Sequence, residues 1–250
     1  MKMNNTFEIS YLGHSCFLIR TINGKNLLVD PWLRTNKSAA IMPEEVHDID
    51  MIAVTHGAWD HLGDAIEICK QNNAHLFCGA EVALHAIDKG IKEENITKMI
   101  YGTALTYQNI GIRAIVAHHI SMVEYKEQIL SGSALSYIFR MEDGTGIYFS
   151  GDTCIFSDLK LYSELYPVDI AIIGMDNLPG CPIEMSGEEA ALVAKWMDVD
   201  VAIPMHYPPD SLEPKKFATT LEKTRVKPVI LKPGQVFSYE RKSYNGKVKE

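Results

Sequence analysis

Alternating apolar and polar positions fill most of the first thirty residues and predict β-strands there. The dipeptide Asn23-Gly24 interrupts this pattern and is typical of a tight hairpin turn. Two short apolar runs then predict buried strands, and apolar residues at helical spacing follow each of them. The predicted strands are 7–12, 15–22, 25–30, 50–55 and 75–78, and the predicted helices are 62–71 and 81–89.

The middle of the chain returns to strand patterns, and the last third alternates strands with helices. Ser186 and Glu189 have the spacing of a capping box, which predicts a helix that begins at Gly187. The predicted strands are 99–107, 112–117, 134–141, 146–150, 168–174, 201–204 and 228–231, and the predicted helices are 156–165, 187–197 and 214–223.

The order of these elements indicates an α/β (α+β) protein with a mixed sheet. A chain of 250 residues is long enough for one large domain or two small ones. No linker, low-complexity tract or short repeat divides it, so we expect a single domain over residues 1–250. The pattern alone predicts strands and helices packed in layers and does not specify how many layers there are.

Composition and charge narrow the possible partners. The formal net charge of −8 argues against a nucleic-acid partner but not against a small anionic substrate, because a metal supplies local positive charge. The five cysteines are odd in number and form no C-x-x-C pair, which argues against a disulfide framework or a zinc knuckle. No apolar run approaches about 18 residues, and no apolar segment follows Met1, so we expect a cytoplasmic protein without a membrane span.

The segment 56–61, His-Gly-Ala-Trp-Asp-His, carries the strongest chemical signal. It follows the predicted buried strand 50–55, and packing gives no reason for a strand to end in two imidazoles and a carboxylate. His56, Asp60 and His61 are suitable ligands for a divalent metal. The alternative is a polar loop with a capping Asp.

Three more metal-capable positions follow predicted strands downstream. They are His118 or His119, Asp152 in a Gly-Asp-Thr turn, and His206 beside prolines. Each alone has an ordinary interpretation as a turn or loop residue. Adjacent residues of a strand point to opposite faces, so at most one of His118 and His119 reaches a shared site, and we select His119 by its offset from the preceding strand. Strand ends at one edge of a layered fold converge, so we expect a common site.

The order of these motifs resembles the metallo-β-lactamase superfamily, whose first motif is His-x-His-x-Asp-His. The segments 11–16, 29–31, 55–57, 152–153 and 204–207 are similar to the branch of small metal-dependent hydrolases that includes ascorbate-6-phosphate lactonase. This resemblance implies an αββα sandwich of two mixed β-sheets flanked by helices. His14 lies in a Gly-His-Ser turn where that branch often has His, and a turn histidine that bonds backbone is an equal alternative.

The resemblance also implies two metal sites that share Asp152. The first would retain His56 and His119 but lack the second His of the motif, because position 58 is Ala58. The second would retain all its ligands: Asp60, His61, Asp152 and His206. We see three explanations for Ala58, namely a natural one-metal variant, an inactivated relative and an engineered substitution. Losing one imidazole weakens the first site more than the second.

These observations predict a metal-dependent hydrolase that acts on a small ester, lactone or phosphodiester. One or two ions of Zn, Mn or Fe would serve as cofactor, and Asp60 would both bind metal and orient the nucleophile. Arg34 or Lys37, in the loop after Val29-Asp30-Pro31, could receive an anionic substrate group. The alternatives are a non-catalytic or inactivated metal-binding protein and, last, a di-iron redox protein. The sequence leaves the substrate, the metal and a possible homo-oligomer open.

Overall fold

The protein, in a computed structural model that describes residues 6–175, 177–178 and 181–241, is built around two seven-stranded β-sheets. Both sheets are mixed, because parallel and antiparallel neighbours occur in each. In spatial order the first sheet contains β16 (Val236–Tyr239), β1 (Phe7–Gly13), β2 (Cys16–Arg20), β3 (Asn26–Val29), β4 (Met51–Ala53), β5 (His75–Cys78) and β6 (Ile96–Lys98).

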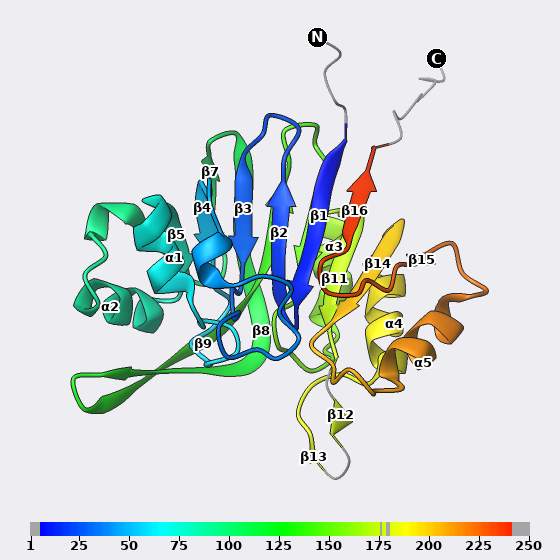
Figure 1. Ribbon diagram of the computed structural model, residues 1–250. Coiled ribbons are helices and arrows are strands. Elements are labelled where there is room, and N and C mark those ends of the chain that lie inside the picture. Colours follow the sequence, from blue (N-terminus) through cyan, green and yellow to red (C-terminus); the bar gives the residue numbers. More distant parts are fainter. Residues whose placement is uncertain (1–5, 176, 179–180, 242–250) are drawn as a thin grey trace.

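The second sheet lies against the first (Figure 1). In spatial order it contains β15 (Lys227–Pro228), β14 (Val201–Met205), β11 (Ile170–Gly174), β10 (Gly146–Phe149), β9 (Gln128–Arg140), β8 (Ile110–Tyr125) and β7 (Ala104–Tyr107). A separate two-stranded ribbon consists of β12 (Asn177–Leu178) and β13 (Cys181–Pro182).

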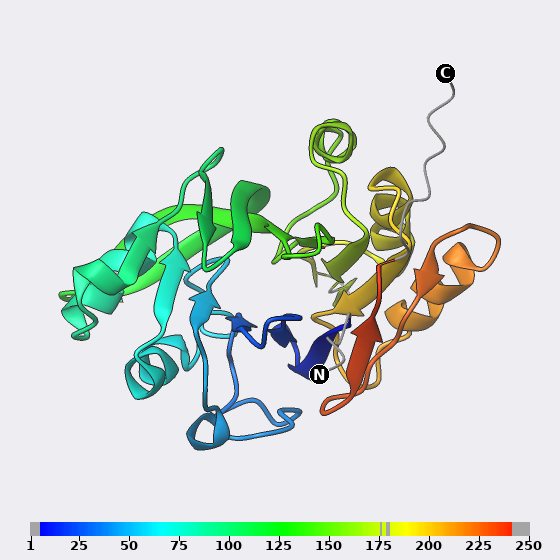
Figure 2. The same cartoon turned by 90° about the horizontal axis from the view of Figure 1, so that it is seen from above.

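Three apolar layers hold the sheets and helices together. The layer between the sheets includes Phe17 of β2 and Phe149 of β10, whose rings meet edge to face at 5.9 Å. A second layer packs helices onto the outer face of the first sheet, and a third does so for the second sheet. Figure 2 shows the cyan helix α1 outside one sheet and the yellow-green helix α3 outside the other. The predicted sandwich of helices, two mixed sheets and helices is confirmed.

The helices fall into two groups according to the sheet they cover. The helices α1 (Ala65–Asn72) and α2 (Ala80–Asp88) cover the first sheet, and α3 (Asp158–Leu165), α4 (Gly187–Trp196) and α5 (Glu213–Leu221) cover the second. Two short 3-10 helices, η1 (Pro43–Glu45) and η2 (Glu93–Asn95), lie in connections. The predicted capping box of α4 is confirmed, because the Ser186 and Glu189 side chains each accept a hydrogen bond from the other residue's backbone N–H. No helix among the described residues is long and apolar enough to cross a membrane.

Strand direction brings polar residues to one edge of both sheets. In the first sheet β1, β3 and β4 run the same way, since β1 and β3 are both antiparallel to β2 and β4 is parallel to β3. In the second sheet β10, β11 and β14 are parallel. The carboxyl ends of these strands carry His14, Asp30, His56, Asp152 and His206.

The prediction of a single strand at 99–107 is wrong. The chain forms β6 in the first sheet, turns at Gly102 with a φ of 87°, and enters the second sheet as β7. One strand cannot pair continuously in two different sheets, so the backbone has to turn between β6 and β7. Apolar residues lie on both sides of Gly102, so the sequence pattern did not show where the chain passes from one sheet to the other.

The prediction that strands 112–117 and 134–141 are short is also wrong. β8 continues to Tyr125 and β9 begins at Gln128, so that the two form a long hairpin beneath α2 (Figure 1). The hairpin turns at Lys126 and Glu127, which have φ values of 47° and 61°. Asn and Gly are the usual residues for such a turn, and their absence hid it from sequence reasoning. The strand β16 also was not predicted.

Candidate metal centre

Three polar residues that follow strands have left-handed backbone. His14 follows β1, Asp30 follows β3 and His206 follows β14, with φ values of 55°, 46° and 61°. This conformation costs an L-residue roughly 1–2 kcal/mol, because Cβ approaches the next carbonyl. It ends each strand abruptly and directs the chain across the edge of its sheet. The backbone N–H of His206 then donates to the carbonyl of His14, which joins the two sheets at this edge.

Asp152 reaches the site through a glycine. Gly151 has a φ of 56°, and a Cβ there would lie 2.8 Å from Cβ of Thr55, which follows β4 of the other sheet. Only glycine therefore allows the two sheets to approach this closely. The result is that Asp152 is placed, buried, against the segment that follows β4.

The segment 56–61 is fixed by backbone contacts. A Cβ on Gly57 would lie 2.5 Å from the carbonyl oxygen of Met122 in β8, so this residue too must be glycine. The carbonyl of Ala58 accepts hydrogen bonds from the backbone N–H groups of His61 and Leu62. The carbonyl of Asp60 accepts one from the Ser15 hydroxyl. None of these contacts uses the side chain at position 58.

Imidazoles surround the Asp152 carboxylate on several sides. Its Oδ1 lies 3.0 Å from Nε2 of His61. Its Oδ2 lies 3.6 Å from Nε2 of His56, 3.5 Å from Nε2 of His206 and 3.9 Å from Nε2 of His119. Asp152 thus lies in the middle of the residues that the sequence pointed to.

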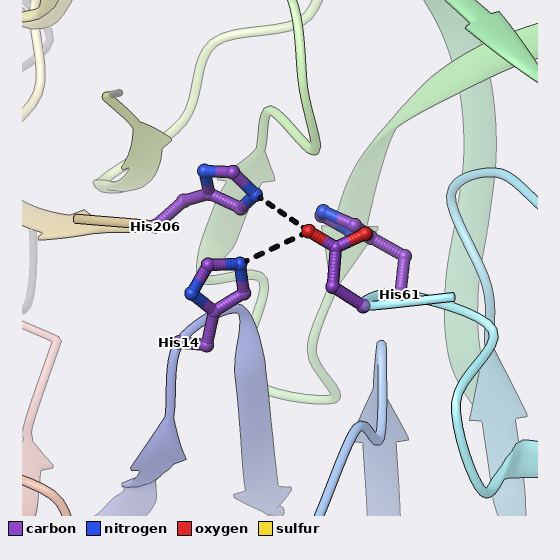
Figure 3. Close-up of side chains that lie close together, drawn as sticks. His14, His61 and His206 are labelled. Atoms are coloured by element: carbon purple, nitrogen blue, oxygen red, sulfur yellow. Dashed lines mark hydrogen bonds and ion pairs between the residues drawn. The ribbon is translucent and has the colours of Figure 1, made fainter. Parts of the chain in front are cut away.

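A second set of contacts centres on Asp60. Its Oδ2 lies 3.3 Å from Nε2 of His14 and 3.4 Å from Nε2 of His206. Figure 3 shows the rings of His14 and His206 directed toward this oxygen from different strands. The two rings lie 4.0 Å apart between centroids. His14 therefore faces the cluster with its side chain.

Partners on Nδ1 orient three of the imidazoles. Nδ1 of His61 lies 2.8 Å from Oδ2 of the fully buried Asp30, which also accepts from the Thr55 hydroxyl. That hydroxyl lies 3.0 Å from Nδ1 of His56.

Glu184 faces His206, with its Oε2 3.2 Å from Nδ1, as an ion-pair contact and not as a well-oriented hydrogen bond. With Nδ1 directed at these partners, each ring turns Nε2 toward the centre, which is how second partners orient histidine ligands.

The pKa shifts describe a buried, negatively charged pocket. Burial would raise the pKa of Asp152, but the rings of His61 and His206 outweigh it and hold that pKa well below its usual range. Burial would lower the pKa of His61, but Asp152 and Asp30 raise it to about 10. Burial also raises the pKa of Glu184 to about 7.

The other imidazoles of the cluster have lowered pKa values. Burial lowers the pKa of His56, His119 and His14, and the nearby carboxylates of Asp152 and Asp60 offset this only in part. Neutral imidazole is the form that binds metal. Without a cation, protons on His61 and His206 balance the buried carboxylates, and a divalent ion could replace them.

The residues present fit a divalent metal. Nε2 of His56, His61 and His206 and Oδ1 of Asp152 are buried and find no well-oriented hydrogen-bond partner among the described residues. Buried polar atoms of native proteins rarely stay unpaired without a reason such as an ion. Three overlapping sets of potential ligand atoms come within 4.8 Å of one another: His14, Asp60, His61 and His206; His56, His61 and Asp152; and Asp152, Glu184 and His206. Mixed imidazole and carboxylate ligands suit Zn, Mn or Fe.

A break in the pairing of β8 with β9 separates the roles of His118 and His119. Val116 pairs with Leu135 and Ile120 with Ser133, so three residues of β8 lie opposite one residue of β9. Such a bulge redirects side chains next to many active sites. The structure places His119 toward Asp152, whereas the ring of His118 packs on Phe156 at 4.4 Å.

The six predicted ligands, His56, Asp60, His61, His119, Asp152 and His206, lie together, and their role in binding metal remains a prediction. Sequence reasoning missed Asp30 and Glu184. Asp30 had a usable signal, since it ends a strand in Val-Asp-Pro, whereas nothing in the sequence around Glu184 marks it. His47, His75 and His85 contact other parts of the protein.

The two cations after β3 differ in their surroundings. Arg34 contacts Glu44 and Glu67, each at 2.6 Å. No described carboxylate forms an ion pair with Lys37, which lines a cavity together with His14. Lys37 is therefore the available cation of this loop.

Proteins similar to this chain include metal-dependent hydrolases. A family profile described as a beta-lactamase superfamily domain matches residues 8–206. A UPF0173 metal-dependent hydrolase of Methanopyrus kandleri is 39% identical over 240 residues, which cover 94% of this chain and 100% of that protein. Another, of Methanobrevibacter smithii, is 36% identical over 244 residues, with 95% and 99% covered.

A solved structure gives the same result at the level of the fold. A metallo hydrolase of the archaeon Ignicoccus hospitalis aligns with a TM-score of 0.79 and 26% identity, over 95% of this chain and 100% of that one. Together the fold and these matches define the class as metal-dependent hydrolases of the β-lactamase type. The chain belongs to the metallo-β-lactamase superfamily and, within it, to the UPF0173 group.

Proposed function

We propose that the protein hydrolyses a small ester, lactone or phosphodiester with the help of a divalent cation held at the edge of the two sheets. The observation that carries the proposal is the convergence of Nε2 of His61 and His206 with carboxylate oxygens of Asp60 and Asp152, all within 4 Å of a neighbour in the set. The names of the UPF0173 relatives support the same class of activity.

Asp60, His61, Asp152 and His206 would hold the better of two metal positions. His14 would add a fifth ligand atom, because its Nε2 faces the same oxygen of Asp60 as His206 does. His56 and His119 would hold a weaker second position beside Asp152, because Ala58 contributes no imidazole. A divalent cation, when bound there, supplies Lewis acidity and lowers the pKa of water to near neutrality.

Side chains of the protein would carry out the remaining chemistry. Asp60 would have a second role, because one of its oxygens can accept a hydrogen bond from the attacking water and orient it. Asp30 and Glu184 would keep Nδ1 of His61 and His206 protonated and so hold both rings in place. The burial of Asp152 excludes bulk water from the centre.

An inactive metal-binding protein is the alternative, and Ala58 is the observation that favours it. Loss of one imidazole from the first motif reduces the ligands of the weaker position to His56, His119 and Asp152. The stronger position keeps all its ligands in either case. Metal binding without turnover would therefore distinguish the alternative from a hydrolase.

The test is turnover after controlled metal loading. Protein depleted of metal would be reloaded with Zn, Mn or Fe and assayed on p-nitrophenyl acetate, a small lactone and bis(p-nitrophenyl) phosphate. We expect turnover of one class only after loading, and a loss of about 100-fold or more for Asp60→Asn. Asp210→Asn, at an exposed residue beyond His206, serves as control. Metal binding without turnover of any of the three would reject the hydrolase.

A further inference from the structure

A cavity opens beside the candidate metal centre. It has a volume of about 570 Å3, which is the usual size of a small-molecule site. His14 belongs to its lining and at the same time contacts Asp60. A molecule in this cavity would therefore lie next to the metal ligands.

Aromatic side chains form a series from the metal centre outward. The ring of Trp32 meets the ring of His14 at 5.0 Å, and the ring of Trp59 meets that of Trp32 at 4.7 Å and 90°. Trp32 is held in place by a hydrogen bond from Nε1 to the hydroxyl of Thr35. Two rings at a right angle form a corner that accepts a flat group against one ring face and one ring edge.

Trp59 leaves much of its apolar surface uncovered. It is 69% exposed, although it lies directly before Asp60 in the sequence. Tyr207, Pro208 and Pro209 add further apolar surface to the lining of the cavity. A flat apolar group bound here would cover surface that is otherwise exposed to water, and it would leave its reactive bond close to Asp60.

Lys37 adds a charge to this apolar cavity. It lines the cavity, is exposed, and has no described carboxylate as ion-pair partner. Arg34, three residues earlier, is occupied by Glu44 and Glu67. In a chain of net charge −8, an available cation in a cavity wall favours an anionic ligand.

We infer that the cavity selects substrates that combine a flat aromatic group with a negative charge, the aromatic group lying against Trp32 and Trp59 and the charge near Lys37. This inference rests on the proposed function, since it names the substrate class of the same site. It goes beyond that function in assigning recognition to Trp32, Trp59 and Lys37, none of which is a candidate metal ligand.

Binding to metal-free protein tests the inference without turnover. The chain has three tryptophans, and Trp196 lies on α4 under Lys160, away from the cavity. In a Trp196→Phe background, tryptophan fluorescence reports only on Trp32 and Trp59. The probes are phenylphosphonate, methylphosphonate and benzyl alcohol, which have ring and charge, charge alone and ring alone, and cannot be hydrolysed.

We expect phenylphosphonate to bind at least tenfold more tightly than either of the other probes. Trp59→Ala should remove this advantage over methylphosphonate, and Lys37→Met should remove it over benzyl alcohol. Arg34→Met, at the paired cation of the same loop, should leave all three affinities unchanged. Equal affinity of phenyl- and methylphosphonate, or no effect of Trp59→Ala and Lys37→Met, would overturn the inference.

The outcome is separable from that of the proposed function. Selective binding of phenylphosphonate without hydrolysis in the metal-loaded assay would reject the hydrolase and retain the ligand class. Hydrolysis with equal KM for aromatic and aliphatic anionic substrates would retain the hydrolase and reject the ligand class.

Discussion

At the scale of single residues, His14 and His206 show how the two sheets share one centre. They follow β1 and β14 in different sheets, both with positive φ, and both direct Nε2 at one oxygen of Asp60. The carbonyl of His14 also accepts the backbone N–H of His206. A change at His14 should therefore affect the centre even though the first motif does not contain it.

Replacing His14 with Ala should weaken metal binding at least tenfold, about 1.4 kcal/mol, because one ligand atom is lost from the stronger position. Competition with a chelator of known affinity measures this. His118→Ala is the matched control, since that ring packs on Phe156 instead. Equal affinities of the two variants would exclude His14 as a ligand.

Ala58 is the second residue on which the account depends. Its carbonyl bonds His61 and Leu62 whatever its side chain, so the backbone can accept histidine there. Ala58→His should raise bound metal from about one ion toward two per chain and increase turnover, as in two-metal hydrolases. Ala58→Leu adds bulk without a ligand and should do neither.

Elemental analysis and rate measurements on the same samples separate the three explanations of Ala58. A natural one-metal enzyme predicts high wild-type turnover that the added histidine leaves flat or lowers. An inactive relative predicts a gain of metal without turnover. An unchanged metal content and rate would reject our expectation for this position.

At the scale of elements, the hairpin of β8 and β9 supports the metal segment. The hydroxyl of Ser121 in β8 accepts the backbone N–H of Gly57 at 2.8 Å and donates to the buried carboxylate of Glu81 in α2. The contact connects α2, the hairpin and the residue after His56.

Ser121→Ala should lower the free energy of unfolding by about 1–3 kcal/mol, because it leaves the N–H of Gly57 and the carboxylate of Glu81 without their partner. Urea denaturation measures the change. Ser133→Ala, at an exposed position of the same hairpin, should stay within about 0.5 kcal/mol of wild type. A similar small effect at both positions would show that the connection contributes little.

The sequence pattern did not predict the full length of this hairpin. Strands with regular alternation and a turn at Asn23-Gly24 were predicted within a few residues, because local pattern and local structure coincide there. The polar run at His118 and His119 was interpreted as the end of a strand, whereas the strand continues through a bulge. Bulges depend on pairing with a distant segment, which one strand's pattern does not encode.

At the scale of the whole molecule, the centre lies between two sheets, one formed by β1 to β6 with β16 and the other by β7 to β11, β14 and β15. The order of motifs was enough to predict six histidines and aspartates that the structure brings together, but not Asp30 beside them. The sequence could not predict Glu184 as part of the centre, because it comes near His206 only through the packing of the chain around β14. The layering of the two sheets came from resemblance and not from the pattern of positions.

Removal of metal should destabilise the whole protein, because an ion that binds only the folded chain adds its binding free energy to the stability of the fold. A ligand present at 100 times its Kd stabilises by about 2.7 kcal/mol. For a chain of this size that corresponds to a decrease in Tm of about 5–10 °C after chelation. Calorimetry with and without chelator measures it, and His206→Ala protein should show a much smaller difference. A Tm that chelation does not change would mean that no metal supports the fold.

The central claim is that Asp60, His61, Asp152 and His206, with His14, form the stronger metal position. Anomalous diffraction from crystals grown with Zn or Mn, recorded on both sides of the metal's absorption edge, tests it most directly. We expect a peak about 2.0–2.2 Å from Nε2 of His206 and from a carboxylate oxygen of Asp60. A peak bound only by other residues, or no peak at this edge of the sheets in metal-saturated crystals, would contradict it.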